Sequence, residues 1–146
     1  MRGGSSLLDG ASSFNETQGF VNWNLPWLWD LGKDWRLQTR LDFSGGWLGK
    51  RSSNAAIGTV GPTLVLSRGR LPLSFEAGSG PTLLSRDTFP SSDLGSKLQF
   101  STFVGLIWDF AKHWRLGYRF DHISNGGLSS PNPGLRMHLL GLSYRF

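Results

Sequence analysis

Apolar and polar residues alternate with a period of two along much of this chain. Successive side chains of a β-strand point to opposite faces of the sheet, so this period predicts strands. Between residues 35 and 47, one face carries Trp35, Leu37, Thr39, Leu41 and Phe43. The other face carries Arg36, Gln38, Arg40, Asp42 and Ser44. The pattern predicts no helix and seven strands, at residues 19–29, 35–47, 56–66, 73–83, 97–110, 114–124 and 136–146.

The connections between these strands alternate in length. They are short after Trp29, Leu66 and Phe110, and long after Trp47, Leu83 and Ser124. Outer-membrane barrels pair short turns at one end with long loops at the other, and turn apolar side chains outward and polar ones inward. A soluble lipocalin-like barrel has the same period, but its apolar side chains point inward and its polar ones outward. We favour an all-β, antiparallel, up-and-down transmembrane β-barrel, because strands of about 10–13 residues match a tilted membrane span.

The number of predicted strands does not fit a closed bacterial barrel, which has an even number. Residues 1–17 are rich in Gly and Ser, and we expect them to form an outer loop of a single domain covering residues 1–146. A signal peptide and a first strand are then expected to be missing from the chain. The alternative is that residues 3–8 form a poor first strand.

Composition removes several kinds of site. The chain has no cysteine, which excludes disulfides and thiol nucleophiles. His113, His122 and His138 show no metal-ligand spacing, so we expect neither a metal nor a cofactor. A net charge of +5 suits contact with phosphates or simple solubility. Arg68 and Arg70 are interpreted as solvated charges of a turn, and no nucleic-acid partner is expected.

Candidate chemistry lies at the end of the predicted strand 114–124. His122 and Ser124 continue its apolar face, and residues two apart on one face have Cβ atoms roughly 7 Å apart. Their side chains can bring an imidazole nitrogen within reach of a hydroxyl, as activation of a serine nucleophile requires. The competing interpretation is that both residues mark the exit of the strand into lipid headgroups and that Asn125-Gly126-Gly127 is only a turn.

His122-x-Ser124-Asn125, followed by Pro131-Asn132-x-Gly134, resembles the signature of the lipid A 3-O-deacylases. The segment 76–80 (Glu-Ala-Gly-Ser-Gly) is also similar to that family. The resemblance implies an eight-stranded barrel esterase of the bacterial outer membrane that removes the 3-hydroxyacyl chain of lipid A. It implies Ser124 as nucleophile, His122 as base and Asn132 as oxyanion donor, supported by Asn125 or the backbone of Gly126-Gly127. Lipid A and outer-membrane lipids would be the partners, and a homodimer stays open.

One position departs from the family pattern. The resemblance places a carboxylate fourteen residues after the histidine, where this chain has Arg136. An arginine cannot accept a hydrogen bond from an imidazole, and its charge disfavours the imidazolium. Three alternatives follow: a weakened Ser–His dyad, a replacement acceptor such as His138 or Asp93, or a structural or lipopolysaccharide-binding barrel without catalysis.

Overall fold

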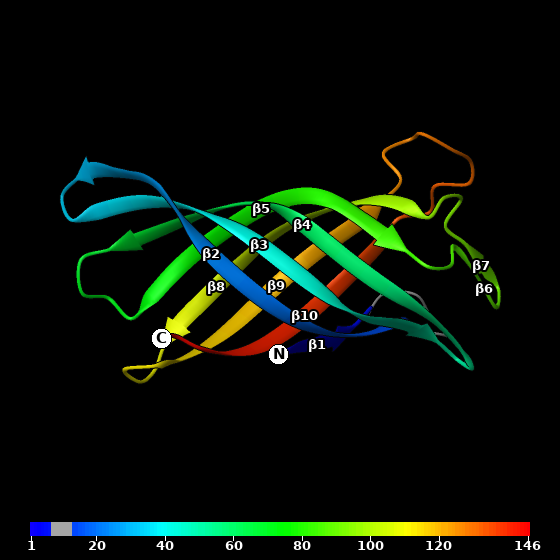
Figure 1. Cartoon of the computed structure of the whole chain (residues 1–146), viewed down its shortest axis with the longest axis horizontal. Helices are drawn as coiled ribbons and strands as arrows, with labels where there is room; N and C mark the ends of the chain where they lie inside the picture. Colours follow the sequence, from blue (N-terminus) through cyan, green and yellow to red (C-terminus); the bar gives the residue numbers. More distant parts are fainter. Residues whose placement is uncertain (7–12) are drawn as a thin grey trace.

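Strands of one antiparallel sheet close into a barrel in the computed structural model, which describes residues 1–6 and 13–146. The described barrel strands are β1 (Arg2–Ser5), β2 (Asn15–Gly32), β3 (Trp35–Lys50), β4 (Ser53–Arg68), β5 (Leu73–Leu84), β8 (Leu98–Asp109), β9 (Trp114–Ser124) and β10 (Leu135–Tyr144). A separate small sheet pairs β6 (Thr88–Phe89) with β7 (Ser92–Asp93). Each barrel strand pairs with the next along the chain, and β1 pairs with β10 (Figure 1), which confirms the predicted up-and-down barrel. Nowhere in the described residues is there a helix long and apolar enough to cross a bilayer.

The strand β1 corrects the prediction of seven strands and of a missing first strand. It lies between β10 and β2, with Gly4 opposite Leu139 on one side and Glu16 on the other. Its sequence, Arg-Gly-Gly-Ser, has no apolar alternation, so the period of two could not reveal it. A Cβ at Gly4 would lie 1.7 Å from the carbonyl oxygen of His138, so closure at this point requires glycine. Of the predicted loop 1–17, residues 7–12 lie outside the described residues.

Long connections gather at the end of the barrel on the right in Figure 1, where β5 joins β8 and β9 joins β10. The turns from β2 to β3, β4 to β5 and β8 to β9 lie at the opposite end. One predicted long loop, after Trp47, is wrong, because only two residues separate Lys50 of β3 from Ser53 of β4. The strands continue here because Leu48 and Ala55 are fully buried inside the barrel.

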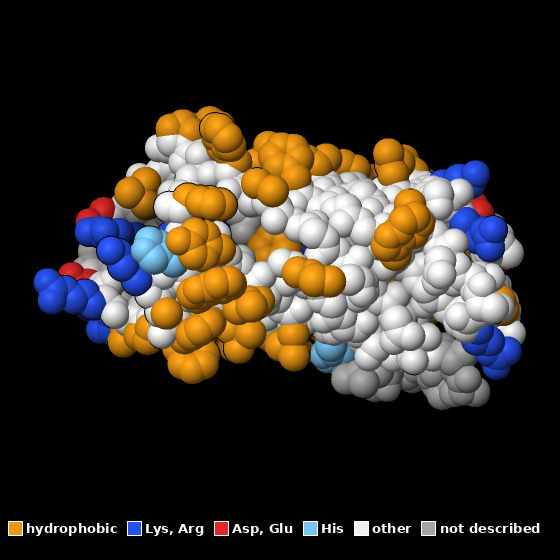
Figure 2. Space-filling view, turned by 60° about the horizontal axis from the view of Figure 1, so that its bottom comes forward, with side chains coloured by type: hydrophobic (Ala, Val, Ile, Leu, Met, Phe, Trp, Pro, Cys, Tyr) orange, Lys and Arg blue, Asp and Glu red, His pale blue; other side chains and the backbone are white. Residues whose placement is uncertain are grey.

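The exterior of the barrel is apolar over most of its wall. Large apolar side chains on different strands are more than half exposed, among them Trp23, Val104 and Leu140. In Figure 2 such side chains gather over the left half of the barrel wall and along its upper edge, and the lysines, arginines and acidic residues lie toward the two ends. The apolar-outward sense predicted for a membrane barrel is therefore confirmed, and the inverted sense of a lipocalin-like barrel is not present.

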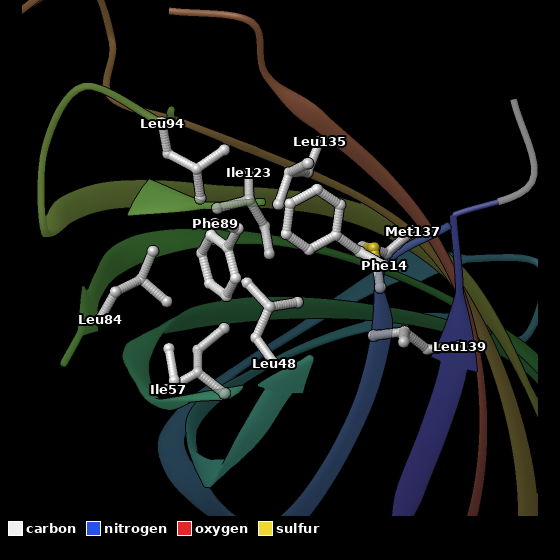
Figure 3. Close-up of a cluster of buried hydrophobic side chains, with 11 residues drawn as sticks. Phe14, Leu48, Ile57, Leu84, Phe89, Leu94, Ile123, Leu135, Met137 and Leu139 are labelled. Atoms are coloured by element: carbon white, nitrogen blue, oxygen red, sulfur yellow. The ribbon is translucent and has the colours of Figure 1, made fainter. Parts of the chain in front are cut away.

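The interior differs in part from the predicted polar filling. At the end with the long connections, buried apolar side chains from the strands and from the β5–β8 connection pack together (Figure 3). They are Phe14, Leu48, Ala55, Ile57, Leu84, Phe89, Leu94, Ile123, Leu135, Met137 and Leu139. The polar filling lies deeper in the barrel, on the same strands. The apolar cluster thus supports from within the stretch of wall that carries His122 and Ser124.

Buried ion pairs hold the middle of the barrel together. Arg119 of β9 donates hydrogen bonds to Glu76 of β5 and to Asp42 of β3, the latter at 2.6 Å. Arg40 also donates to Glu76, at 2.7 Å, and the Arg119 guanidinium lies 3.8 Å from the ring centre of Phe103. All four charged side chains are less than a tenth exposed. Each of these charged side chains has an opposite charge as its partner. The ion pairs link β3, β5 and β9, which are not neighbours in the sheet.

Replacing Arg119 with Met should lower the free energy of unfolding by about 3–5 kcal/mol, because Glu76 and Asp42 each lose a buried cationic partner. Urea unfolding of the refolded protein in detergent micelles, followed by tryptophan fluorescence, measures the change. Arg145→Met is the matched control, because this side chain is 50% exposed and 3.9 Å from Asp109. The control should change stability by no more than about 0.5 kcal/mol. Equal losses in the two variants would contradict the proposed role of the network.

Candidate active site

His122 and Ser124 lie on the exterior of the barrel at the end of β9 that leads into the long β9–β10 connection. His122 is exposed and Ser124 partly exposed, whereas Ile123 between them is 1% exposed and points inside. The alternation thus places the imidazole and the hydroxyl on the same outer face, as predicted. Across the sheet, His122 is opposite Thr102 of β8 and Arg136 of β10.

No hydrogen bond joins His122 to Ser124 among the bonds formed by the described residues, and their Cβ atoms are separated by the spacing of one strand face, roughly 7 Å. Hydrogen bonds between catalytic groups are often long in ligand-free enzymes and tighten when substrate binds. Neither side chain forms a hydrogen bond with another group in the described part of the chain, so no such bond has to break before rotation brings the two together.

Gly134 packs directly on the His122 ring. A Cβ at this glycine would lie 2.8 Å from Cε1 of the imidazole, and its φ of 66° falls in the left-handed region that favours glycine. The β9–β10 connection therefore returns over the imidazole just before β10 begins, and it limits the positions that the ring can take. Gly134 belongs to the sequence motif, but its contact with His122 could not be predicted, because it depends on the path of the connection.

Asn125 organises that connection from the inside. Its side chain is fully buried, and Nδ2 donates to the carbonyl oxygens of Leu94, Ser129 and Pro131 at 3.0–3.1 Å. Its Oδ1 accepts a hydrogen bond from the backbone N–H of Gly127 at 2.9 Å. With its donors directed at loop carbonyls, Asn125 is placed to position the connection. This geometry favours positioning over the oxyanion role considered for Asn125 from the sequence.

Asn132 is oriented by the same network. The backbone N–H of Asn125 donates to Oδ1 of Asn132 at 3.2 Å, which turns the Nδ2 group of Asn132 away from that bond. The side chain is exposed, and no hydrogen bond from its Nδ2 occurs among the described residues. The amide of Asn132 is thus held through its Oδ1, while its Nδ2 has no acceptor among the described residues. This arrangement suits an oxyanion, which needs donors fixed before charge develops.

No carboxylate reaches His122 within the described part of the chain. Asp121 points into the barrel, where its carboxylate accepts a bond from Ser101 at 2.7 Å. Oδ1 of Asp93 accepts from the backbone N–H of Gly95 at 2.8 Å. Arg136, directly across from His122, is exposed and carries the opposite charge to the one that the family pattern requires there.

His138, the other candidate acceptor, is directed away from His122. Its Nδ1 lies 2.7 Å from the hydroxyl of Tyr118, and its ring centre is 5.2 Å from that of Phe120. Tyr118 and Phe120 precede His122 on the outer face of β9, so His138 faces the part of the wall farther from the site. Among the described residues, neither of the replacement acceptors considered from the sequence, His138 or Asp93, forms a hydrogen bond with His122.

Comparison with known proteins supports the resemblance seen in the motif. Residues 17–145 match the model of a protein family described as lipid A 3-O-deacylase (PagL). The chain belongs to this family. The match covers nearly all of the barrel, including β9 and β10.

Individual members of the family agree with this assignment. The chain is 31% identical to the lipid A deacylase PagL of Bordetella bronchiseptica over 140 residues, which is 86% of this chain and 74% of that protein. It is 37% identical to the lipid A deacylase PagL of Pseudomonas aeruginosa over 65 residues, 44% of this chain and 38% of that protein. A crystal structure of the outer membrane enzyme PagL superposes with a TM-score of 0.81 at 21% identity, covering 99% of this chain and 97% of that one. At that identity the superposition establishes the fold.

Replacing Gly134 with Ala should slow covalent labelling of Ser124 by a fluorophosphonate about 10²-fold, because a displaced imidazole no longer removes the serine proton. Labelling is measured by mass spectrometry of the intact protein. The matched control is Gly127→Ala: Gly127 also has a left-handed φ, 79°, but a Cβ there would meet no atom within 4 Å. If both variants slow labelling equally, backbone strain and not the contact with His122 is responsible.

Proposed function

We propose that this chain is an outer-membrane lipid A 3-O-deacylase, a carboxylic-ester hydrolase that removes the 3-hydroxyacyl chain from the 3-position of lipid A. The observation that carries the proposal is the placement of His122 and Ser124. Both lie on the apolar exterior of a barrel of this family, beside a connection that holds the amide of Asn132 in a fixed orientation.

An exterior site suits a substrate that is itself part of the membrane. Polar side chains on the lipid-facing surface of a barrel are costly in the hydrocarbon and cost little near the interface. His122, Ser124 and Arg136 share the outer face beside the long β9–β10 connection, so an interfacial position is the one that their polarity allows. Lipid A in the outer leaflet presents its ester bonds at that depth and can approach the wall from the side.

The proposed reaction proceeds through an acyl-enzyme. Oγ of Ser124 forms a bond to the ester carbonyl carbon while Nε2 or Nδ1 of His122 takes its proton. The Nδ2 group of Asn132 donates to the oxyanion that forms. The sugar 3-oxygen then leaves with the proton from His122. Water, activated by the same imidazole, attacks the acyl-serine and releases a 3-hydroxy fatty acid and free Ser124.

A dyad without a carboxylate is expected to be slow but functional. Loss of the third member of a serine triad can lower the turnover rate by about 10⁴ while the remaining groups still catalyse the reaction. The second candidate function is a structural or lipopolysaccharide-binding barrel without catalysis, and the charge of Arg136 is the observation that favours it. Dimer formation remains a prediction from the sequence.

Ser124→Ala should abolish deacylation, because no nucleophile remains to form the acyl-enzyme. The refolded protein is incubated with lipopolysaccharide, and the lipid A is then examined by mass spectrometry for loss of one 3-hydroxyacyl chain. Ser130→Ala serves as the control for removal of a hydroxyl in the same connection, because Ser130 is exposed and its hydroxyl forms no hydrogen bond among the described residues. Equal residual activity in the parent and Ser124→Ala would contradict the serine mechanism.

Asn132→Asp and Asn132→Ala together test the oxyanion role. The Asp variant keeps the oxygen that accepts from the Asn125 backbone but loses the Nδ2 donor, so the connection should stay in place while kcat falls about 10²–10³-fold. The Ala variant loses both the acceptor oxygen and the Nδ2 donor. Initial rates on lipid A report the combined effect on turnover, and labelling of Ser124 reports the nucleophile alone. Together they separate the oxyanion role of Asn132 from its role in the connection. An Asp variant as active as the parent would exclude Asn132 as the oxyanion donor.

A further inference from the structure

Arg136 is the feature of the site that the proposed mechanism leaves without a role. It lies on the outer face of β10, in register with His122 of β9, and its side chain is exposed. Residues directly opposite in an antiparallel pair have Cα atoms about 4.5–5.5 Å apart, so the guanidinium can reach the immediate surroundings of the imidazole. In the described part of the chain, Arg136 forms no salt bridge.

This arrangement is unfavourable for catalysis unless an anion is present. His122 must become an imidazolium as Ser124 attacks, and a neighbouring positive charge opposes that step. The opposition is stronger at a lipid-facing wall than in bulk water, because charges interact more strongly at low dielectric. The two carboxylates considered above, Asp121 and Asp93, have other partners, the Ser101 hydroxyl and the Gly95 backbone N–H.

The substrate can supply the missing anion. Lipid A is a glucosamine disaccharide that carries phosphate, and the glucosamine with the 3-ester also bears the glycosidic phosphate. Arginine binds phosphate with two parallel hydrogen bonds, which lysine cannot reproduce. A phosphate monoester carries a charge of about −1.5 to −2, so its pair with one guanidinium keeps a net negative charge.

We propose that Arg136 binds a phosphate of the lipid A headgroup and thereby brings beside His122 a negative charge that the described residues do not place there. The inference rests on the proposed function and adds a substrate requirement to it. Bound in this way, the phosphate both fixes the glucosamine over Ser124 and stabilises the imidazolium. The chain should therefore discriminate between phosphorylated and dephosphorylated lipid A, and Arg136 should determine that preference.

The test compares two substrates and three variants. Release of the 3-hydroxy fatty acid is measured in mixed micelles from phosphorylated lipid A and from the same lipid A after removal of the glycosidic phosphate by mild acid. The parent should prefer the phosphorylated substrate at least about tenfold in kcat/KM, corresponding to 1.4 kcal/mol. Arg136→Gln should lose the preference, Arg136→Lys should restore part of it, and Arg136→Glu should hydrolyse the dephosphorylated substrate better than the parent does. Arg70→Gln, in the exposed β4–β5 turn, controls for loss of positive charge.

Two further measurements separate the outcomes. Inorganic phosphate added to the dephosphorylated substrate should not restore turnover, and restoration would overturn the assignment to the lipid headgroup. Binding of both lipids to the Ser124→Ala protein, followed by tryptophan fluorescence, tests recognition without catalysis. If no variant hydrolyses either lipid but binding depends on both phosphate and Arg136, the phosphate contact of Arg136 stands, whereas the proposed activity and the role of the phosphate in stabilising the imidazolium are wrong. If the parent binds and hydrolyses both lipids equally, the inference is wrong and the activity stands.

Discussion

Backbone hydrogen bonding imposes the main constraint on this molecule. In hydrocarbon, an unpaired N–H or C=O group costs several kcal/mol, so a sheet that spans a membrane must close on itself. Here closure depends on the four residues of β1, which pair with β10 on one side and β2 on the other. Once the sheet is closed, the strict alternation of side chains decides which residues face outward. The exterior position of His122 and Ser124 is a consequence of that alternation.

The interior keeps this stretch of wall in place. Ile123, between His122 and Ser124, packs into the apolar cluster with Leu135 of the facing strand. Deeper in the barrel, Arg119 joins β9 to Glu76 and Asp42 on other strands. The apolar cluster and the Arg119 ion pairs thus hold β9 at two points along its length. The positions of His122 and Ser124 can therefore be well defined even though their side chains lie at the surface. The β9–β10 connection completes the site, and Asn125 ties it together through its buried amide.

The alternation in the sequence was sufficient to predict the barrel, the outward-facing apolar wall and the outer face of His122. It could not reveal β1, because Gly3 and Gly4 pair through their backbones and carry no side-chain pattern. The sequence also predicted a loop where β3 continues to Lys50. The reason is that Leu48, which points inward, is followed directly by Gly49 and Lys50, so the apolar alternation ends there. The role of Asn125 depends on the carbonyl of Leu94, which is 31 residues away in the chain. Contacts of this kind are set by the closed barrel and leave no local signal.

Placing residue 124 against lipid tests the central claim most directly. The chain has no cysteine, so a single cysteine can carry a nitroxide spin label at a chosen position. In a reconstituted bilayer, a label at position 124 should relax strongly with dissolved oxygen, which concentrates in lipid. A label at Ser101, 3% exposed and inside the barrel, should be shielded from it. A label at 124 that oxygen cannot reach, together with one at 101 that it can, would mean that the wall faces the other way and that the site does not open to the membrane.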